Sequence, residues 1–471
     1  MNSTELYAYQ DTYFEILNIF FIDIVGQEAS FFNSFEEVYK EILKNSNKLQ
    51  NGMNPFSDLS SSLLALYAES GINVYKFAQE LNACKLVLGG SSRFYGTQLN
   101  ATKRSLLFSD TVLIPDPILP YLEKDRSEEK FFYIAIVQAA FYILRMKELN
   151  DTKFDVLPFI VFPSWEKSLE DKDPETQAKM IQLTTDIFSH YVDSGIRSFD
   201  DIHEFSISHE QVFLEKIRTH QLFIAPGRKP GEDIKTSMNS YRAEMLETRS
   251  AEWCKDYLEK PDNFLIINAI FERVSPQYHL LENANELRSS PLLCIDSQAH
   301  YYKLVTSMNN SFISNWNNQD SQTGGIVKAL TNPRMSFLSN IPYDQMISIR
   351  QSNENIQFRR ELRGLVKSLS STNVEDVDLV ASEVCFHIEL LISKHRKELE
   401  NIKSKYQAVY KHNALIGSAS LVVAMTPVLA PLAGLGLVAT GGSYIKSKLA
   451  ERDELNRASR SLMGIISLAK P

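Results

Sequence analysis

The chain has 471 residues, of which 44% are hydrophobic and 23% charged, which is the composition of an ordinary globular protein of about three domains. A disulfide scaffold and a paired-cysteine metal site are excluded by the wide spacing of its cysteines, Cys84, Cys254, Cys294 and Cys385. The net charge of −9 is divided unevenly, with a net −14 in residues 1–349 and a net +5 in residues 350–471. The body is therefore acidic and the C-terminal part basic.

The start of the chain lacks the features of a secretory signal. Its first basic residue is Lys40, and Glu15 and Asp23 interrupt the early apolar stretch. A secretory signal needs a positive segment followed by an uninterrupted apolar one. We therefore expect a prokaryotic cytoplasmic protein, with peripheral association at the inner membrane as the further option.

Residues 1–170 are predicted to form a helical domain with short strands. Periodic apolar residues and terminator signals predict helices at 4–25, 35–48, 59–88 and 128–149. Apolar runs rich in β-branched residues predict strands within 106–114 and 154–162. Pro158 cannot donate a ladder hydrogen bond, so the second strand is expected at a sheet edge.

Residues 171–307 are predicted to form a central, mostly helical domain. Its best strand candidates are the apolar runs 222–226 and 264–271. Residues 308–325 are rich in Asn, Ser, Gln and Gly, which bury little apolar surface. We therefore predict a linker over 308–343.

Residues 344–471 are predicted to form a C-terminal helical domain. Asp344 is a candidate cap for a helix that runs to about residue 370, and Thr372 and Glu375 form a candidate capping box for the next. From Val377 to Val409 apolar residues recur at spacings of three and four, which predicts one long amphipathic helix about 50 Å in length. A further amphipathic helix is predicted over 446–468.

Between these helices lies a stretch without formal charge, from Lys411 to Lys446. Pro427 and Pro431 cannot both lie inside one continuous helix, so the stretch divides into arms at 414–426 and 432–445. Each arm would be about 20 Å long as a helix, whereas the hydrocarbon core of a bilayer is about 30 Å thick. We expect a hydrophobic helical hairpin, 412–446, that is hidden from water in protein or in lipid.

The hairpin supplies the candidate functional residues of the chain. Small residues permit close approach of its arms, and lysines on both sides would hold both ends at the same face of an anionic membrane. The hairpin residues are Leu415, Gly417, Leu421, Val422, Pro427, Pro431, Gly434, Gly436, Gly441 and Gly442. The basic flank is formed by Lys403, Lys405, Lys411, Lys446 and Lys448.

Two acidic patterns could serve a metal-dependent hydrolase or nuclease, and each has a simpler explanation. Pro115-Asp116 with Glu128-x-Lys130 resembles a PD-(D/E)xK nuclease signature, but Glu128 and Lys130 lie at a predicted helix start, where acids favour the helix dipole. The second group is Asp200, Asp201, His203, His209 and Glu210. A turn with capping acids explains it better than a metal site, because the six-residue spacing of its histidines is not one that metal sites use.

Three further patterns are weak. The glycines of 86–96 follow an apolar run, but the lysine of a phosphate-binding loop is missing. His387 and His395 share one side of the long predicted helix, where a half-buried histidine is expected and protonation is a conceivable trigger. A solvated helix face is a better explanation than nucleic-acid binding for the basic residues Arg350, Arg359, Arg360, Arg363 and Lys367.

The sequence thus predicts a mainly α protein, multi-helical, with a few short strands in its N-terminal and central parts. We expect a non-enzymatic interaction protein, without cofactor, that binds a protein partner, its own copies or an anionic membrane through the hairpin. Its layout resembles that of bacterial effectors such as toxins and anti-phage defence components. The alternatives are a soluble adaptor with the hairpin in its core, and a hydrolase or nuclease whose first candidates would be Asp110 and Asp116.

Overall fold

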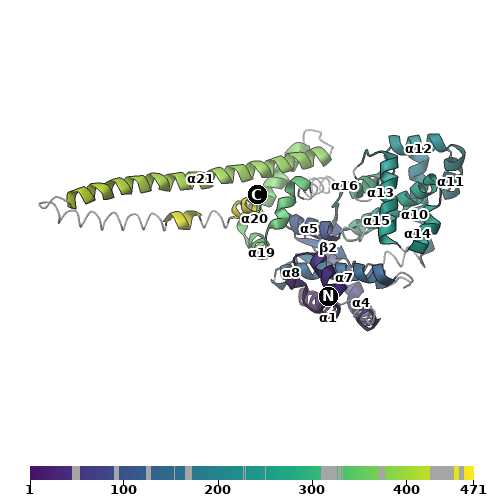
Figure 1. The fold of residues 1–471 in the computed structure, drawn as a ribbon, viewed down its shortest axis with the longest axis horizontal. Helices are drawn as coiled ribbons and strands as arrows, with labels where there is room; N and C mark the ends of the chain where they lie inside the picture. Colours follow the sequence, from purple (N-terminus) through teal and green to yellow (C-terminus); the bar gives the residue numbers. More distant parts are fainter. Residues whose placement is uncertain are drawn as a thin grey trace. The chain divides into compact units, whose positions relative to one another are not determined.

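The computed structural model describes most of the chain and divides it into two compact units, Met1–Thr331 and Asn332–Pro471. The described residues are 1–44, 53–89, 95–122, 129–152, 154–164, 172–225, 228, 230–249, 251–308, 326, 330, 332–370, 377–424, 450–455 and 461–470. The fold is mainly helical with one small sheet, which confirms the predicted fold class (Figure 1). The second unit begins inside the stretch predicted as a linker.

A parallel four-stranded sheet lies at the centre of the first unit, in the order β3-β2-β1-β4. Its strands are β1 (Lys85–Leu88), β2 (Thr111–Pro115), β3 (Phe159–Phe162) and β4 (Ser290–Leu292). β3 lies at an edge, as Pro158 predicts. β4 comes from the predicted central domain and pairs with β1, so the two predicted regions share the sheet.

The other regular elements of the first unit are helices, among the residues that the structure describes. They are α1 (Ser3–Val25), η1 (Ala29–Phe31), α2 (Phe35–Lys44), α4 (Met53–Glu80), α5 (Tyr95–Ser105), α6 (Leu119–Leu122), α7 (Glu129–Met146), α8 (Glu148–Asp151), α10 (Pro174–Tyr191), α11 (Phe199–Ser208), α12 (Glu210–Thr219), α13 (Ile234–Thr248), α14 (Ala251–Leu258), α15 (Asp262–Glu286) and α16 (Asp296–Met308). α15 packs on β1 and β4, and α4 packs on β3. α1 packs on α4 and α7 and joins the core through the ring of Phe14, 5.9 Å from that of Phe159.

The sequence predictions were wrong at three places in this unit. Residues 264–271, predicted as a strand, lie inside α15, and residues 222–225 of the other strand candidate have no strand pairing. Residues 85–88, predicted as the end of a helix, form β1 instead. A short apolar run that is buried on all sides has no diagnostic period, so a core helix and a parallel strand look alike in sequence.

The second unit consists of η3 (Pro333–Asn340), α19 (Tyr343–Gln351), α20 (Asn353–Ser370), α21 (Val377–Ala424), a helical segment at 450–455, and α23 (Leu462–Ala469). The helix predicted from Asp344 to about residue 370 is broken at Ser352. The backbone of Ser352 is extended, and its hydroxyl oxygen accepts from the Asn355 amide at 3.3 Å at the start of α20. The predicted capping box at Thr372 and Glu375 lies outside the described residues.

The long helix predicted from Val377 is confirmed, and it continues further than expected. α21 has 48 residues, which corresponds to a length of about 72 Å. It runs through most of the arm predicted at 414–426, so the long helix and this arm are one element. Figure 1 shows α21 extending well beyond the helices that pack on its N-terminal half.

Candidate functional site

The N-terminal half of α21 is anchored by apolar packing against α20 and α23. Val384, Ile388 and Ile392 on α21 are at most 2% exposed, and Ile466 of α23 is fully buried. Burial of such side chains contributes about 1.5–3 kcal/mol each. The base of the helix is therefore a fixed part of the second unit.

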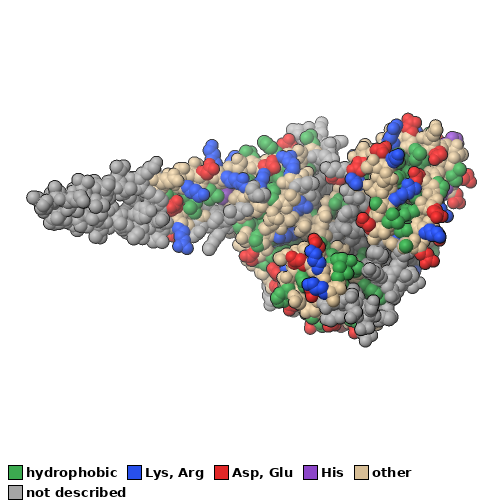
Figure 2. Space-filling view, in the orientation of Figure 1, with side chains coloured by type: hydrophobic (Ala, Val, Ile, Leu, Met, Phe, Trp, Pro, Cys, Tyr) green, Lys and Arg blue, Asp and Glu red, His purple; other side chains and the backbone are tan. Residues whose placement is uncertain are grey.

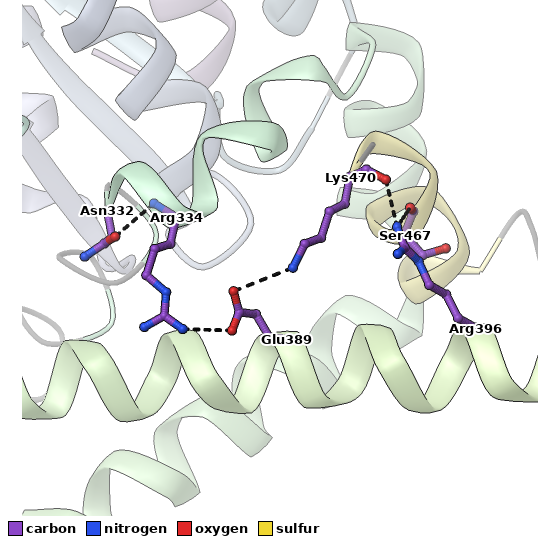
Figure 3. A network of polar contacts seen from close by, with 6 residues as sticks. All are labelled: Asn332, Arg334, Glu389, Arg396, Ser467 and Lys470. Atoms are coloured by element: carbon purple, nitrogen blue, oxygen red, sulfur yellow. Dashed lines mark hydrogen bonds and ion pairs between the residues drawn. The ribbon is translucent and has the colours of Figure 1, made fainter.

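Polar contacts hold α23 and η3 against the same part of α21 (Figure 3). Glu389 of α21 accepts from Arg334 Nη2 at 2.9 Å and lies 3.6 Å from Lys470 Nζ. Arg396 donates to the carbonyl oxygens of Ser467 at 3.2 Å and Lys470 at 2.8 Å, so its guanidinium caps the C-terminal end of α23. Asn332 caps η3 by accepting from the Arg334 amide.

A second contact lies further along α21 and joins it to the chain that follows the hairpin. Glu454 lies 3.0 Å from Lys405 Nζ and accepts from the Tyr406 hydroxyl at 2.8 Å. Lys405 is 60% exposed, so this ion pair contributes little to stability. Its importance is geometric, because it places residues on either side of the uncharged stretch next to each other.

The structure describes only part of the predicted hairpin. Leu415, Gly417, Leu421 and Val422 lie in α21, but the side chains of 408–424 are outside the described residues, as is that of Lys411. Lys403 and Lys405 are described and exposed. Outside the described residues altogether lie Pro427, Pro431, Gly434, Gly436, Gly441, Gly442, Lys446 and Lys448. Among the helices that are described, none combines the length and hydropathy required for a membrane span.

His395 lies in the buried stripe of α21, as predicted, and is buried. Its Nδ1 is 3.8 Å from Glu398 Oε2, and its Nε2 has no hydrogen-bond partner within the described part of the chain. His387 is only partly exposed. Its burial in the apolar stripe of α21, with Glu398 one helical turn away, is the arrangement of a packed core histidine.

Asp116, at the C-terminal end of β2, is the centre of a polar cluster that the sequence did not predict. Its carboxylate is 1% exposed and accepts from the hydroxyls of Tyr13 and Tyr67 and from the Ile118 amide. Burial raises the pKa of Asp116, although these donors oppose the shift. Tyr9 lies nearby, and its buried hydroxyl has no hydrogen-bond partner among the described residues; burial and the charge of Asp116 raise its pKa. The cluster ties α1 and α4 to the sheet.

Asp110 and Asp116, the first candidates for hydrolase or nuclease chemistry, are not brought together by the structure. Asp110 lies at the other end of β2, where it accepts from the Cys84 amide at 2.8 Å. The five residues of β2 separate it from Asp116, a distance of about 20 Å, so the two carboxylates cannot share a metal ion. Glu128 lies outside the described residues, and the side chain of Lys130 is not described.

The acidic and histidine group at 200–210 forms helix ends. Asp201 belongs to a capping box with Ser198 at the start of α11, and His209 ends that helix. His203 packs on the rings of Phe199 and Phe264. Across the described ranges, no group of three or more His, Cys, Asp or Glu side chains could hold a metal ion.

The glycine-containing loop after β1 meets the first turns of α5 and α16. The Gly89 carbonyl accepts from Gln98 at 3.2 Å and from Gln298 at 2.6 Å, both buried. A Cβ at Gly89 would lie 2.6 Å from Leu280 Cδ1, so only glycine fits. Gly90 to Phe94 are outside the described residues, and the loop has no lysine where a phosphate-binding loop requires one.

The basic residues from Arg350 to Lys367 belong to α19 and α20. Arg359 donates to Asn355 at 2.8 Å, and Arg360 and Arg363 are exposed. The side chain of Lys367 is not described. Because Phe358 and Leu362 are buried, Arg360 and Arg363 lie on the solvated face of the amphipathic helix α20. Arg350 belongs to α19 and is only partly exposed.

Comparison of the chain with protein-family models, with curated proteins and with solved structures gave no match.

Proposed function

We propose that this chain is a non-enzymatic interaction protein whose apolar hairpin, 412–446, associates with a membrane or with other copies of the chain. The observation that carries the proposal is the continuity of α21, which runs from its anchored base into the predicted first arm as far as Ala424. A helix of this length extends beyond the packed helices of its own unit and would carry the apolar stretch with it. This layout is expected of a toxin-like or anti-phage effector.

The contact of Lys405 with Glu454 supports a fold-back at the prolines. Residues 429 and 430 lie halfway along the chain between these two residues, and they fall between Pro427 and Pro431. A chain that folds back at this midpoint would turn where proline disfavours continuation of a helix. In the sequence, the uncharged stretch is centred on about the same point.

The length of this element suits insertion from one side without a complete crossing. From residue 412 to the midpoint a helix measures about 26 Å, slightly less than the hydrocarbon thickness of about 30 Å. Lys411 and Lys446 adjoin the two ends of the uncharged stretch, so a fold-back would bring both lysines to the same side of the membrane. Lysine and arginine side chains are also visible on the described surface of the second unit (Figure 2), which has a net charge of +5. An anionic membrane surface would attract them.

The test is flotation of the full-length chain with vesicles of anionic lipid and with vesicles of neutral lipid. We expect association with the anionic vesicles, and its loss when Leu421→Asp introduces a charge into the hairpin. The matched control is Ile207→Asp, at a 75% exposed apolar residue of α11, which should associate like the wild type. Absence of wild-type association, or association unchanged by Leu421→Asp and by deletion of 412–446, would count against insertion.

A soluble adaptor that keeps the hairpin in its core is the alternative, and the same variants separate the two. In an adaptor the wild type stays in the unbound fraction, and deletion of 412–446 unfolds the protein or abolishes its oligomer. The hydrolase or nuclease alternative has no supporting observation, because Asp110 and Asp116 lie at opposite ends of β2.

A further inference from the structure

The outer face of α21 carries three large apolar side chains that are exposed in the structure. Leu379, Phe386 and Leu390 are 49%, 59% and 40% exposed. They follow one another at spacings of seven and four positions, so they form one stripe along the helix. Figure 1 shows α21 as the longest element of its unit.

This stripe lies opposite the face that anchors α21. Val384, Ile388 and Ile392, which point into the unit, are about half a helical turn away from it. A helix that serves only to anchor would be polar on its outer side. Here a phenylalanine occupies the middle of the outer side, with a leucine on each side of it along the stripe.

The charges on the same face are arranged asymmetrically along the helix. Glu383 lies toward its N-terminal end, and Lys394 and Lys397 lie toward its C-terminal end; all three are exposed. If two copies of α21 cross in antiparallel orientation at residue 388, Phe386 of each lies against Leu390 of the other. Glu383 of each then lies beside Lys394 of the other. A parallel pair would instead place like charges together.

We propose that the outer face of α21 binds the same face of a second copy of the chain, antiparallel, about a twofold axis near residue 388. The apolar centre is closed by Phe386 and Leu390 of both copies, and each Glu383 forms an ion pair with the second copy's Lys394. A twofold contact of this kind is self-complementary, because every residue meets its counterpart twice. Such charge pairs select the orientation more than they add affinity.

This proposal does not depend on the hairpin. An antiparallel pair would carry its two hairpins toward opposite ends of the dimer, so both could not enter one flat membrane together. A dimer through this face is therefore a form of the chain in which at most one hairpin at a time meets a given bilayer.

The test is sedimentation equilibrium of the full-length chain and of charge-reversal variants. Glu383→Lys and Lys394→Glu should each weaken the dimer about tenfold, because two attractions become two repulsions in each case. The double variant should return to the wild-type dissociation constant, since the pairs are restored with exchanged signs. Phe386→Ser should weaken the dimer by about a hundredfold or more, because both copies lose the central ring.

The control is Ile356→Ser, which removes a 58% exposed apolar side chain of α20 outside the stripe and should leave the dimer unchanged. Circular dichroism of each variant verifies that it is folded. A wild type that remains monomeric at about 100 µM would overturn the proposal. Single reversals that leave the dimer unchanged would also overturn the proposal, because association through the hairpin does not depend on these charges. A double variant that dimerises as weakly as the single variants would overturn it as well, because the exchanged charges should restore the pairs.

Discussion

At the scale of single residues, the fold depends on polar side chains whose partners come from distant parts of the chain. Gln10 of α1 donates to the Val161 carbonyl and accepts from the Val161 amide, at 2.8 and 3.1 Å. It thereby pairs with the open edge of β3 as another strand would, and protects that edge. No local pattern could have predicted this contact or the Asp116 cluster, because the partners lie far apart in the sequence.

The variant Gln10→Leu leaves the amide and carbonyl of Val161 buried without partners. Each such group costs about 1–3 kcal/mol, so we expect the first unit to lose about 3 kcal/mol of stability. Chemical denaturation followed by near-ultraviolet circular dichroism measures the change. Thr12→Ala, at an exposed position of the same helix, should change stability by less than about 0.5 kcal/mol; an equal loss there would refute the edge role.

Asp116 gives the stability of the first unit a dependence on pH. Its pKa is raised in the folded state, so its stabilising contribution is complete below the unfolded value of about 3.9 and is lost as pH rises through the folded value. The wild type should therefore lose stability relative to Asp116→Asn between pH 4 and pH 7, as measured by urea unfolding. A constant difference across this range would contradict the raised pKa. Asp116→Leu should cost about 3 kcal/mol or more at any pH, because three donors lose their acceptor.

At the scale of elements, the long helix could be predicted because apolar residues recur along one face of it. The sequence offers no strong breaker between Val377 and Ala424, and Gly417 alone costs only about 1 kcal/mol, so the helix continues into the apolar arm. The break at Ser352 was not predicted. Serine favours the start of a helix but is also found inside helices, so a single serine does not mark a break. Short buried strands and the middle of α15 could not be distinguished, because both are apolar on every side.

The base of α21 should depend on apolar packing rather than on surface charge. Ile466→Ala removes a fully buried side chain and should destabilise the second unit by about 2–4 kcal/mol. Lys405→Gln, at the exposed pair with Glu454, should change stability by less than about 1 kcal/mol. Hydrogen exchange of amides in α23 distinguishes the two. Faster exchange in the Lys405 variant than in the Ile466 variant would reverse this assignment.

At the scale of the whole molecule, the two units differ in charge as the sequence indicated. Met1–Thr331 has a net charge of −14 and Asn332–Pro471 a net charge of +5. The division into an acidic part and a hairpin-bearing part could be predicted from composition. The shared sheet of the first unit could not, because β4 follows β1 by about two hundred residues.

Limited proteolysis should cut within 309–331 and release two folded fragments; first cleavage inside the first unit would contradict this boundary.

If the hairpin acts as proposed, its tip, between Pro427 and Pro431, is withdrawn from water. This claim is tested most directly by an environment-sensitive fluorophore on Leu429→Cys in a Cys84→Ser background, since the three other cysteines are buried. Ile207→Cys provides the exposed reference. We predict a blue-shifted emission at residue 429, either in the protein alone or on addition of anionic vesicles, and none at residue 207. Emission from residue 429 that matches the exposed reference under both conditions would show that the tip remains in water, which contradicts the proposal.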